Sequence, residues 1–114
     1  NISSVAGRKV FDNHSVYCGT KFAVHALTDQ MRAEAAAFDV RFLTIAPGVV
    51  ETELLGHTTN SDIIEGYNQW KATLQDGKGL VSADVAEAIA YAYNQPQRVS
   101  IREIVLAPTR QGPQ

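Results

Sequence analysis

The chain has a single cysteine, Cys18, and no excess of basic residues among its 114 residues. One cysteine excludes a disulfide within the chain and any zinc or iron–sulfur site built from several cysteines, so we expect no metal site. Ten lysine and arginine residues stand against twelve aspartate and glutamate residues, giving a net charge of −2. This balance offers no basic surface for nucleic acid or for an anionic membrane, and we expect neither as a partner.

Long hydrophobic runs are also missing. No apolar stretch approaches the ~20 residues that a membrane span needs, because Arg41, Pro47 and Gly48 interrupt the most hydrophobic part. The chain does not open with a basic segment followed by an apolar one, which is the pattern of a secretory signal. The sequence therefore predicts a protein of the cytoplasm.

What is present is an alternation of helical and strand patterns. Residues 16–38 repeat small and apolar residues at helical spacing, and residues 63–74 and 83–94 could form two further helices. We expect Asn13 or Ser15 to cap the first helix and Ser82 to cap the last. Strands are expected at 40–45 and 99–106, and residues 1–4 resemble the end of another strand.

The order of these elements is strand, helix, strand, polar insert, helix and strand. Strands that alternate with helices predict an α/β fold with a parallel sheet. The chain begins with Asn1 and with the end of a strand rather than its start, so we expect a piece of a longer protein.

Tyr17 and Lys21 carry the first sign of chemistry. A spacing of four residues places their side chains on one face of the long helix, one turn apart. A nearby cation stabilises the phenolate form, which suits a tyrosine to donate or accept a proton in catalysis. A pair at this spacing also arises by chance, so its context decides.

The context agrees with a functional reading. Ser4 follows a strand end thirteen residues before Tyr17, and the loop 47–52 follows the next strand. In an open parallel sheet the carboxyl ends of strands and the starts of the following helices meet at one edge. Ser4, Tyr17, Lys21 and the loop should therefore converge on one cleft.

These residues resemble the short-chain dehydrogenase/reductase family. The resemblance rests on Asn1–Gly7 (NISSVAG), on Tyr17-x-x-x-Lys21 and on Pro47-Gly48-x-x-x-Thr52, in the family's order and spacing. It implies the C-terminal part of a Rossmann-type, doubly wound parallel sheet with three α/β/α layers, in which 1–114 form one partial domain and 53–80 a substrate lid. The ending at 101–109 is similar to the branch with NADP-linked 3-hydroxy acid and serine dehydrogenases.

The resemblance also implies roles for single residues. Tyr17 would be the acid/base, Ser4 would polarise the substrate oxygen, and Lys21 would bind the nicotinamide ribose. The Pro47-Gly48 turn, the backbone of Val50 and the side chain of Thr52 would contact the cofactor. The expected function is an NAD(P)-dependent oxidoreductase that interconverts a secondary alcohol and its carbonyl, with NADP slightly favoured over NAD.

The family's glycine-rich phosphate turn is absent from these residues, which keeps a second interpretation open. The chain would then be a truncated, inactive fragment that serves only as a structural or oligomerisation module. In this family the long helix and the last helix and strand are the usual contacts of a homodimer or homotetramer.

Several residues keep two interpretations. Thr52 could cap a short helix through residue 55, and His14 reads more readily as a solvated histidine than as a catalytic one. Tyr67 and Trp70 fit a core anchor and a substrate pocket equally well. Cys18 is expected as a small buried apolar side chain. Arg102 and Glu103 read as solvated strand positions or as a subunit contact.

Overall fold

The computed structural model describes residues 1–53, 57–74 and 77–112. A short 3-10 helix and a long α-helix come first, and further along two short strands flank a pair of α-helices. In order, the elements are η1 (Val5–Gly7), α1 (Ser15–Ala35), η2 (Ala36–Phe38), β1 (Thr44–Pro47), α2 (Ser61–Lys71), α3 (Ser82–Tyr93) and β2 (Glu103–Leu106).

The strands are parallel, which confirms the predicted α/β architecture. β1 pairs with β2 in a register that sets Thr44 opposite Glu103. On the other side of β1, Ile2 forms a parallel bridge with Ile45. Ile45 N donates to Asn1 O at 2.9 Å, and Ser3 N donates to Ile45 O at 2.7 Å. The first residues thus occupy the position of a third strand, as the sequence predicts.

Both strands begin later than predicted, and arginine side chains bind backbone carbonyls close to the start of the ladder. Arg41 donates to the carbonyls of Tyr93 and Val99 at 3.0 Å each. Arg32 of α1 donates to Phe42 O at 3.0 Å and to Arg102 O at 2.9 Å. Arginine side chains therefore hold the segments that lead into β1 and β2.

The three α-helices are confirmed, but the predicted caps of α1 and α3 are wrong. His14 is the N-cap of α1 and makes no side-chain capping bond, while Asn13 has a φ of 62° in the turn before it. Asparagine tolerates this left-handed conformation better than most residues. Ser82 lies inside α3, and the carboxylate of Asp84 instead accepts from Val81 N at 2.8 Å.

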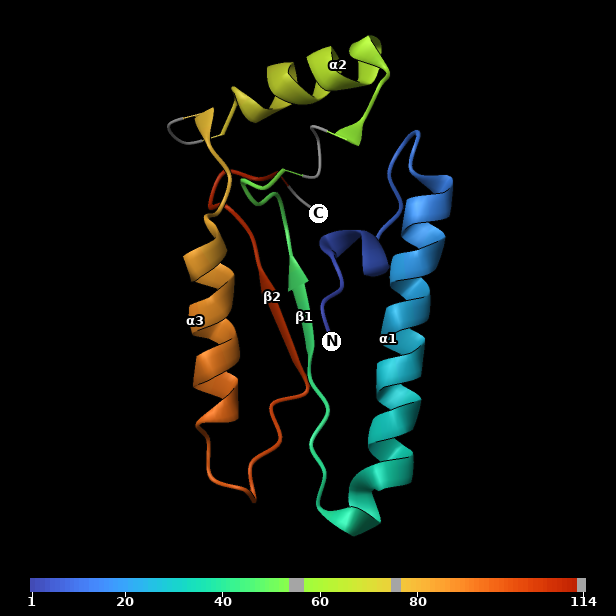
Figure 1. Cartoon of the computed structure of the whole chain (residues 1–114), viewed down its shortest axis with the longest axis vertical. Helices are drawn as coiled ribbons and strands as arrows, with labels where there is room; N and C mark the ends of the chain where they lie inside the picture. Colours follow the sequence, from blue (N-terminus) through green and yellow to red (C-terminus); the bar gives the residue numbers. More distant parts are fainter. Residues whose placement is uncertain (54–56, 75–76, 113–114) are drawn as a thin grey trace.

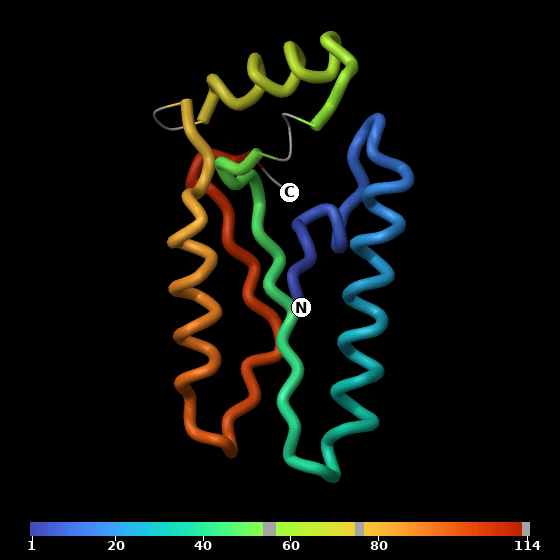
Figure 2. The backbone as a smooth tube through the Cα atoms, viewed as in Figure 1, coloured from blue at the N-terminus to red at the C-terminus, as the bar shows by residue number. Residues whose placement is uncertain are grey.

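Figures 1 and 2 show the strands between two helices that run alongside them, α1 on one side and α3 on the other. Both helices contact β1, whose four residues are all buried. α2 lies across the carboxyl end of the strands, near the start of α1 (Figure 1). Cys18 is buried between α1 and its neighbours, as predicted. No described helix combines the length and apolar character of a membrane span.

Candidate functional site

Ser4 lies where the first strand segment ends and η1 begins. It is the N-cap of η1, and its Oγ accepts a hydrogen bond from Ala6 N at 3.1 Å. This bond uses a lone pair of the hydroxyl and leaves its proton available to another acceptor. Ser4 can therefore donate a hydrogen bond to an oxygen atom of a small molecule.

Ser3, the residue next to Ser4, uses its hydroxyl in the opposite way. Its Oγ donates to the backbone carbonyl of Lys21 at 3.2 Å, and the residue is buried. The proton of Ser3 is thus used to fasten the first segment to α1. The two hydroxyls differ in what they can offer, and Ser4 is the one suited to a substrate.

Tyr17 and Lys21 lie on one face of the first turns of α1, as their spacing predicts. Lys21 Nζ lies 5.7 Å from the centroid of the Tyr17 ring and 3.5 Å from Ile2 O. The Tyr17 side chain is exposed at the carboxyl end of the sheet. At this distance the ammonium group lies within the range of a cation–π contact with the ring. η1 packs against α1, which brings Ser4 toward the same end of the molecule.

The predicted loop begins inside β1, because Pro47 is the last residue of that strand and is buried. Gly48 is required by packing: a Cβ there would overlap the side-chain amide of Gln111 and lie 2.8 Å from Ala107 Cβ. Beyond it, Leu80 N donates to Val49 O at 2.8 Å, and Glu51 N donates to Leu80 O at 2.7 Å. In extended backbone this pattern turns the N–H and C=O of Val50 to the opposite side.

Thr52 lies in an exposed bend just after this bridge. The alternative short helix from Thr52 through residue 55 falls partly outside the described residues. Glu51, which precedes Thr52 in the loop, fixes the loop by two hydrogen bonds. One carboxylate oxygen of Glu51 accepts from Gly79 N at 2.8 Å and the other from Lys71 Nζ at 3.1 Å. These two bonds, from Gly79 first and then Lys71, lower the pKa of Glu51 below its usual 4.5.

Lys71 belongs to α2, so this ion pair ties α2 to the loop that follows β1. The same ammonium lies 6.0 Å from the centroid of the Tyr67 ring, and Tyr67 packs on Trp70 with 5.7 Å between ring centroids. Burial raises the pKa of Tyr67, and the charges of Glu51 and of Tyr17 raise it further. Through Lys71, Tyr67 therefore lies on the side of α2 that is joined to the loop after β1.

His14 stands beside Tyr17, although the sequence favoured a solvated role for it. The His14 and Tyr17 rings meet edge to face with 6.0 Å between centroids. His14 Nδ1 lies 2.7 Å from Asp12 O, so this nitrogen carries the proton and donates to the carbonyl. The exposed imidazole of His14 is thus oriented by the backbone at the rim of the Tyr17 site.

One polar cluster beneath the site was not predicted. Glu103, expected at a solvated position or a subunit contact, accepts from Arg8 Nη2 at 2.8 Å and from Arg8 Nε at 3.1 Å. His25 of α1 is buried, and its Nδ1 lies 3.6 Å from Glu103 Oε1. Arg8 and Glu103 are 95 residues apart, so no local pattern in the sequence indicates their pairing.

The arrangement combines the Ser4 hydroxyl, which can donate, the Tyr17 phenol beside the Lys21 ammonium, and the N–H and C=O of Val50, which face away from Leu80. Such a set can bind an alcohol or carbonyl oxygen, move a proton to or from it, and hold a planar amide. Within the described ranges, no three His, Cys, Asp or Glu side chains gather closely enough to hold a metal ion.

A family model and several known proteins resemble this chain. The family model described as short chain dehydrogenase matches residues 1–62. An uncharacterized oxidoreductase of Staphylococcus saprophyticus is 37% identical over 115 residues, covering 98% of this chain and 44% of that protein. A glycine betaine reductase of Emericella nidulans is 38% identical over 107 residues, which are 94% of this chain and 8% of that protein.

Solved structures resemble the chain over nearly its whole length. The closed form of a serine dehydrogenase complexed with NADP⁺ matches with a TM-score of 0.84 and 27% identity, covering 98% of this chain and 44% of the other. A 4-hydroxyisoleucine dehydrogenase complexed with NADH matches with a TM-score of 0.72 and 26% identity, covering 93% and 43%. The chain thus spans less than half the length of these two dehydrogenases. The predicted Rossmann-type α/β fold is confirmed, and the chain belongs to the short-chain dehydrogenase family.

Proposed function

We propose that this chain carries the catalytic residues of an NAD(P)-dependent oxidoreductase that interconverts a secondary alcohol and its carbonyl. The observation that carries the proposal is the Tyr17–Lys21 pair, with the ammonium 5.7 Å from the phenol ring, at the end of the sheet where Ser4 caps η1. Its membership of a family of oxidoreductases supports the same reaction class.

The three side chains divide the work. Ser4 donates its free proton to the substrate oxygen, which orients and polarises the carbonyl. Tyr17 gives its phenolic proton to that oxygen during reduction and takes the hydroxyl proton back during oxidation. Lys21 stabilises the negative charge that Tyr17 carries between these events. In each role the side-chain group can still reach a bound substrate or its partner residue.

The residues around the loop after β1 fit the nicotinamide half of a dinucleotide. The N–H and C=O of Val50 face away from Leu80 and match the donor and acceptor of a carboxamide, and Thr52 adjoins them. Lys21 would also hold the nicotinamide ribose, and the Pro47-Gly48 turn sets the course of the loop. The bound cofactor would supply or accept the hydride. We favour NADP slightly over NAD, because the serine dehydrogenase that matches this chain was solved with NADP⁺.

The segment 53–80 would form the substrate lid of the single partial domain 1–114. Tyr67 supports this, since its ring lies 6.0 Å from the Lys71 ammonium that binds Glu51 in the loop after β1. Small hydroxy acids and hydroxy amino acids are the first substrates to test, because the matching structures include serine and 4-hydroxyisoleucine dehydrogenases. We also propose a homodimer or homotetramer formed through α1 and through α3 with β2, where Leu27, Tyr93 and Val105 are exposed.

The second candidate is an inactive fragment that keeps only a structural or oligomerisation role. The observation that favours it is coverage: the chain spans 44% of the oxidoreductase from Staphylococcus saprophyticus. A dinucleotide site also needs a glycine-rich phosphate turn, which these residues do not contain.

The two candidates are separated by the mass and the activity of the purified natural protein. We expect a mass about twice the 12.4 kDa of this chain and oxidation of NADPH, or more slowly of NADH, with 2-oxo or 3-oxo acids. The reverse reaction with hydroxy acids should reduce the oxidised cofactor. A mass near 12.4 kDa with no turnover of any carbonyl would favour the fragment instead.

A further inference from the structure

His25 is a buried titratable side chain for which the proposed reaction has no use. It lies in the third turn of α1 with 3% of its surface exposed, and within the described residues neither ring nitrogen has a hydrogen-bond partner. Burying a polar group without a hydrogen bond costs free energy, about 1–3 kcal/mol. Two close neighbours account for its position, the end of η1 and the carboxylate of Glu103.

The first neighbour is the end of η1. A Cβ placed on Gly7 would overlap the imidazole of His25 and would lie 2.6 Å from Ser3 Oγ. The ring thus fills the space directly beneath the Gly7 backbone, and only a glycine allows the turn to lie so close to α1. η1 has two ends: Gly7 stands on His25 at one, and Ser4 forms the cap at the other.

The second neighbour is Glu103 of β2. Its carboxylate lies 3.6 Å from His25 Nδ1 and accepts two hydrogen bonds from Arg8, the residue that caps the end of η1. The bonds from Arg8 lower the pKa of Glu103, which stays ionised near neutral pH. An Arg–carboxylate pair with two parallel bonds fixes geometry as well as charge. Asp29 and Arg32 form a separate ion pair nearby at 2.8 Å.

The turn is therefore held at its far end by two segments that are distant from it in sequence. The imidazole of His25 supports it from α1, and the Arg8–Glu103 pair fastens it to β2. Inside the turn, Gly7 N donates to Ser4 O at 2.8 Å and Ala6 N donates to Ser4 Oγ at 3.1 Å. Any tilt of the turn against α1 would move the Ser4 hydroxyl relative to Tyr17.

We infer that His25, Glu103 and Arg8 form a positioning cluster that locks the Ser4 turn onto α1 and thereby sets the direction in which the Ser4 hydroxyl donates. The cluster acts through Ser4 and touches no reacting atom. Its effect on turnover rests on the proposed function, whereas its effect on the turn does not. The two effects can be measured separately.

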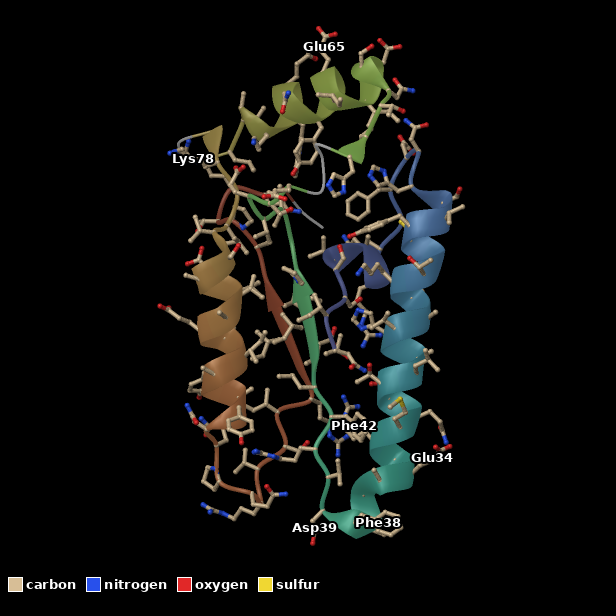
Figure 3. The ribbon with its side chains drawn as sticks, viewed as in Figure 1. Glu34, Phe38, Asp39, Phe42, Glu65 and Lys78 are labelled. Carbon is tan, nitrogen blue, oxygen red and sulfur yellow. The ribbon has the colours of Figure 1, made fainter. Side chains whose placement is uncertain are left out.

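The test compares Glu103→Gln with Glu34→Gln in the complete natural protein. Both changes remove one carboxylate charge with little change in shape. Among the described residues Glu34 accepts from Gln30 alone, at 2.9 Å, and it points away from the strands in Figure 3. Amide hydrogen exchange at Ala6 and Gly7 reports the turn, with the amides of α3 as an internal reference. Steady-state kinetics with the cofactor and a hydroxy acid report kcat, and cofactor fluorescence reports its Kd.

For Glu103→Gln we expect exchange at Ala6 and Gly7 to accelerate at least fivefold and kcat to fall at least fivefold. The cofactor Kd should stay within twofold of wild type, and α3 exchange should not change. Arg8→Lys keeps the charge and one bond, so it should retain at least a third of wild-type kcat. Glu34→Gln should match wild type in every readout.

Unchanged exchange at Ala6 and Gly7 in Glu103→Gln would overturn the inference whatever the kinetics show. Faster exchange with unaltered kcat would overturn the catalytic half of it. If the wild-type protein shows no turnover while exchange responds as expected, the proposed function fails and the hold of the cluster on the turn is supported. Should Glu103→Gln also lose α3 protection, Arg8→Gln, at a half-exposed side chain, provides the same comparison.

Discussion

At the scale of single residues, Ser3 and Ser4 illustrate how two adjacent hydroxyls acquire different roles. The Ser3 hydroxyl donates its proton to the carbonyl of Lys21. The Ser4 hydroxyl accepts from Ala6 N, so its own proton can still be donated. The offset from Tyr17 selected Ser4 in the sequence. The hydrogen-bond directions, which depend on the fold, supply the physical reason for the same choice.

Replacing Ser4 and Ser3 by alanine separates these roles. Ser4→Ala removes the donor to the substrate oxygen and should lower kcat/KM by about 10²-fold, the usual loss of one such donor. Ser3→Ala removes a structural bond and should lower thermal stability while kcat/KM changes less than tenfold. Kinetics and melting temperatures of both variants check this. Equal kinetic losses in the two would contradict the assignment.

Glu103 gives a second prediction at this scale, through its ionisation. Hydrogen bonds from Arg8 lower the pKa of Glu103 in the folded protein below its usual 4.5. The carboxylate therefore stabilises the native state above pH 4.5, and this contribution is lost as the pH falls below that value. Wild type should exceed Glu103→Gln by about 1 kcal/mol in unfolding free energy at pH 7, since the pair is partly solvated.

Urea unfolding at pH 7, 5, 4 and 3 measures this difference. The curves of wild type and Glu103→Gln should converge toward pH 3, because a protonated glutamate resembles glutamine. A constant gap across the whole range would show that the ionised pair with Arg8 is not what the substitution removes.

At the scale of elements, α2 is placed by a few polar contacts rather than by a core. None of its residues is buried, and Asn60 caps it by accepting from Asp62 N at 3.0 Å. Lys71 then joins it to Glu51 at 3.1 Å. Because Glu51 adjoins Val50 and Thr52, the same ion pair connects the proposed cofactor loop with the proposed lid.

Replacing Lys71 by methionine should loosen the lid without touching the acid/base residues. We expect the substrate KM to rise about fivefold with kcat within twofold, since a mobile lid weakens substrate binding more than proton transfer. Lys78→Met is the matched control, because Lys78 influences Glu51 through charge alone and Figure 3 shows it at the far side of α2 from α1. A similar KM change in both variants would argue against the ion pair.

Helices were more predictable than strands and caps. The residues of α1 and α3 repeat at helical spacing over several turns, and their limits fall within about two or three residues of prediction. The strands are shorter than predicted, and close to them Arg41 and Arg32 bind carbonyls 52 and 70 residues away in the sequence. The start of α1 was also not predictable. Asn13, one of the two expected caps, has a φ of 62°, and composition does not indicate such a backbone conformation.

At the scale of the whole molecule, the chain exposes more surface than its size predicts. Its accessible area is 7729 Å², against about 6100 Å² for a compact protein of this mass. Its radius of gyration is 15.7 Å, against about 13 Å. Large apolar side chains such as Leu27, Phe38 and Tyr93 are among the exposed ones. Burial of these exposed apolar side chains requires contact with other protein surface.

The isolated 114-residue chain should therefore unfold with low cooperativity and bind a hydrophobic dye. Dye fluorescence should be several times that of a complete domain of the family at equal molar concentration, because burial of apolar surface provides most folding free energy. A sharp unfolding transition and no dye binding for the isolated chain would contradict this expectation.

The site could be predicted in part. Tyr17, Lys21 and Ser4 follow from spacing, because a helix turn and a strand end fix where their side chains lie. The contacts of Glu51 with Lys71, and of Arg8 with Glu103, join residues 20 and 95 positions apart. Only the packing of α2 over the sheet and of β2 beside β1 brings these charges together, so no local pattern reveals them.

The central claim is that Tyr17 transfers the proton to and from the substrate oxygen. Tyr17→Phe keeps the ring beside Lys21 and removes only the hydroxyl. In the complete protein, turnover should fall by about 10²–10⁴-fold, the usual contribution of a general acid, with the cofactor Kd within threefold of wild type. Turnover within a few-fold of wild type would contradict the claim and return Tyr17 to the status of a surface residue of α1.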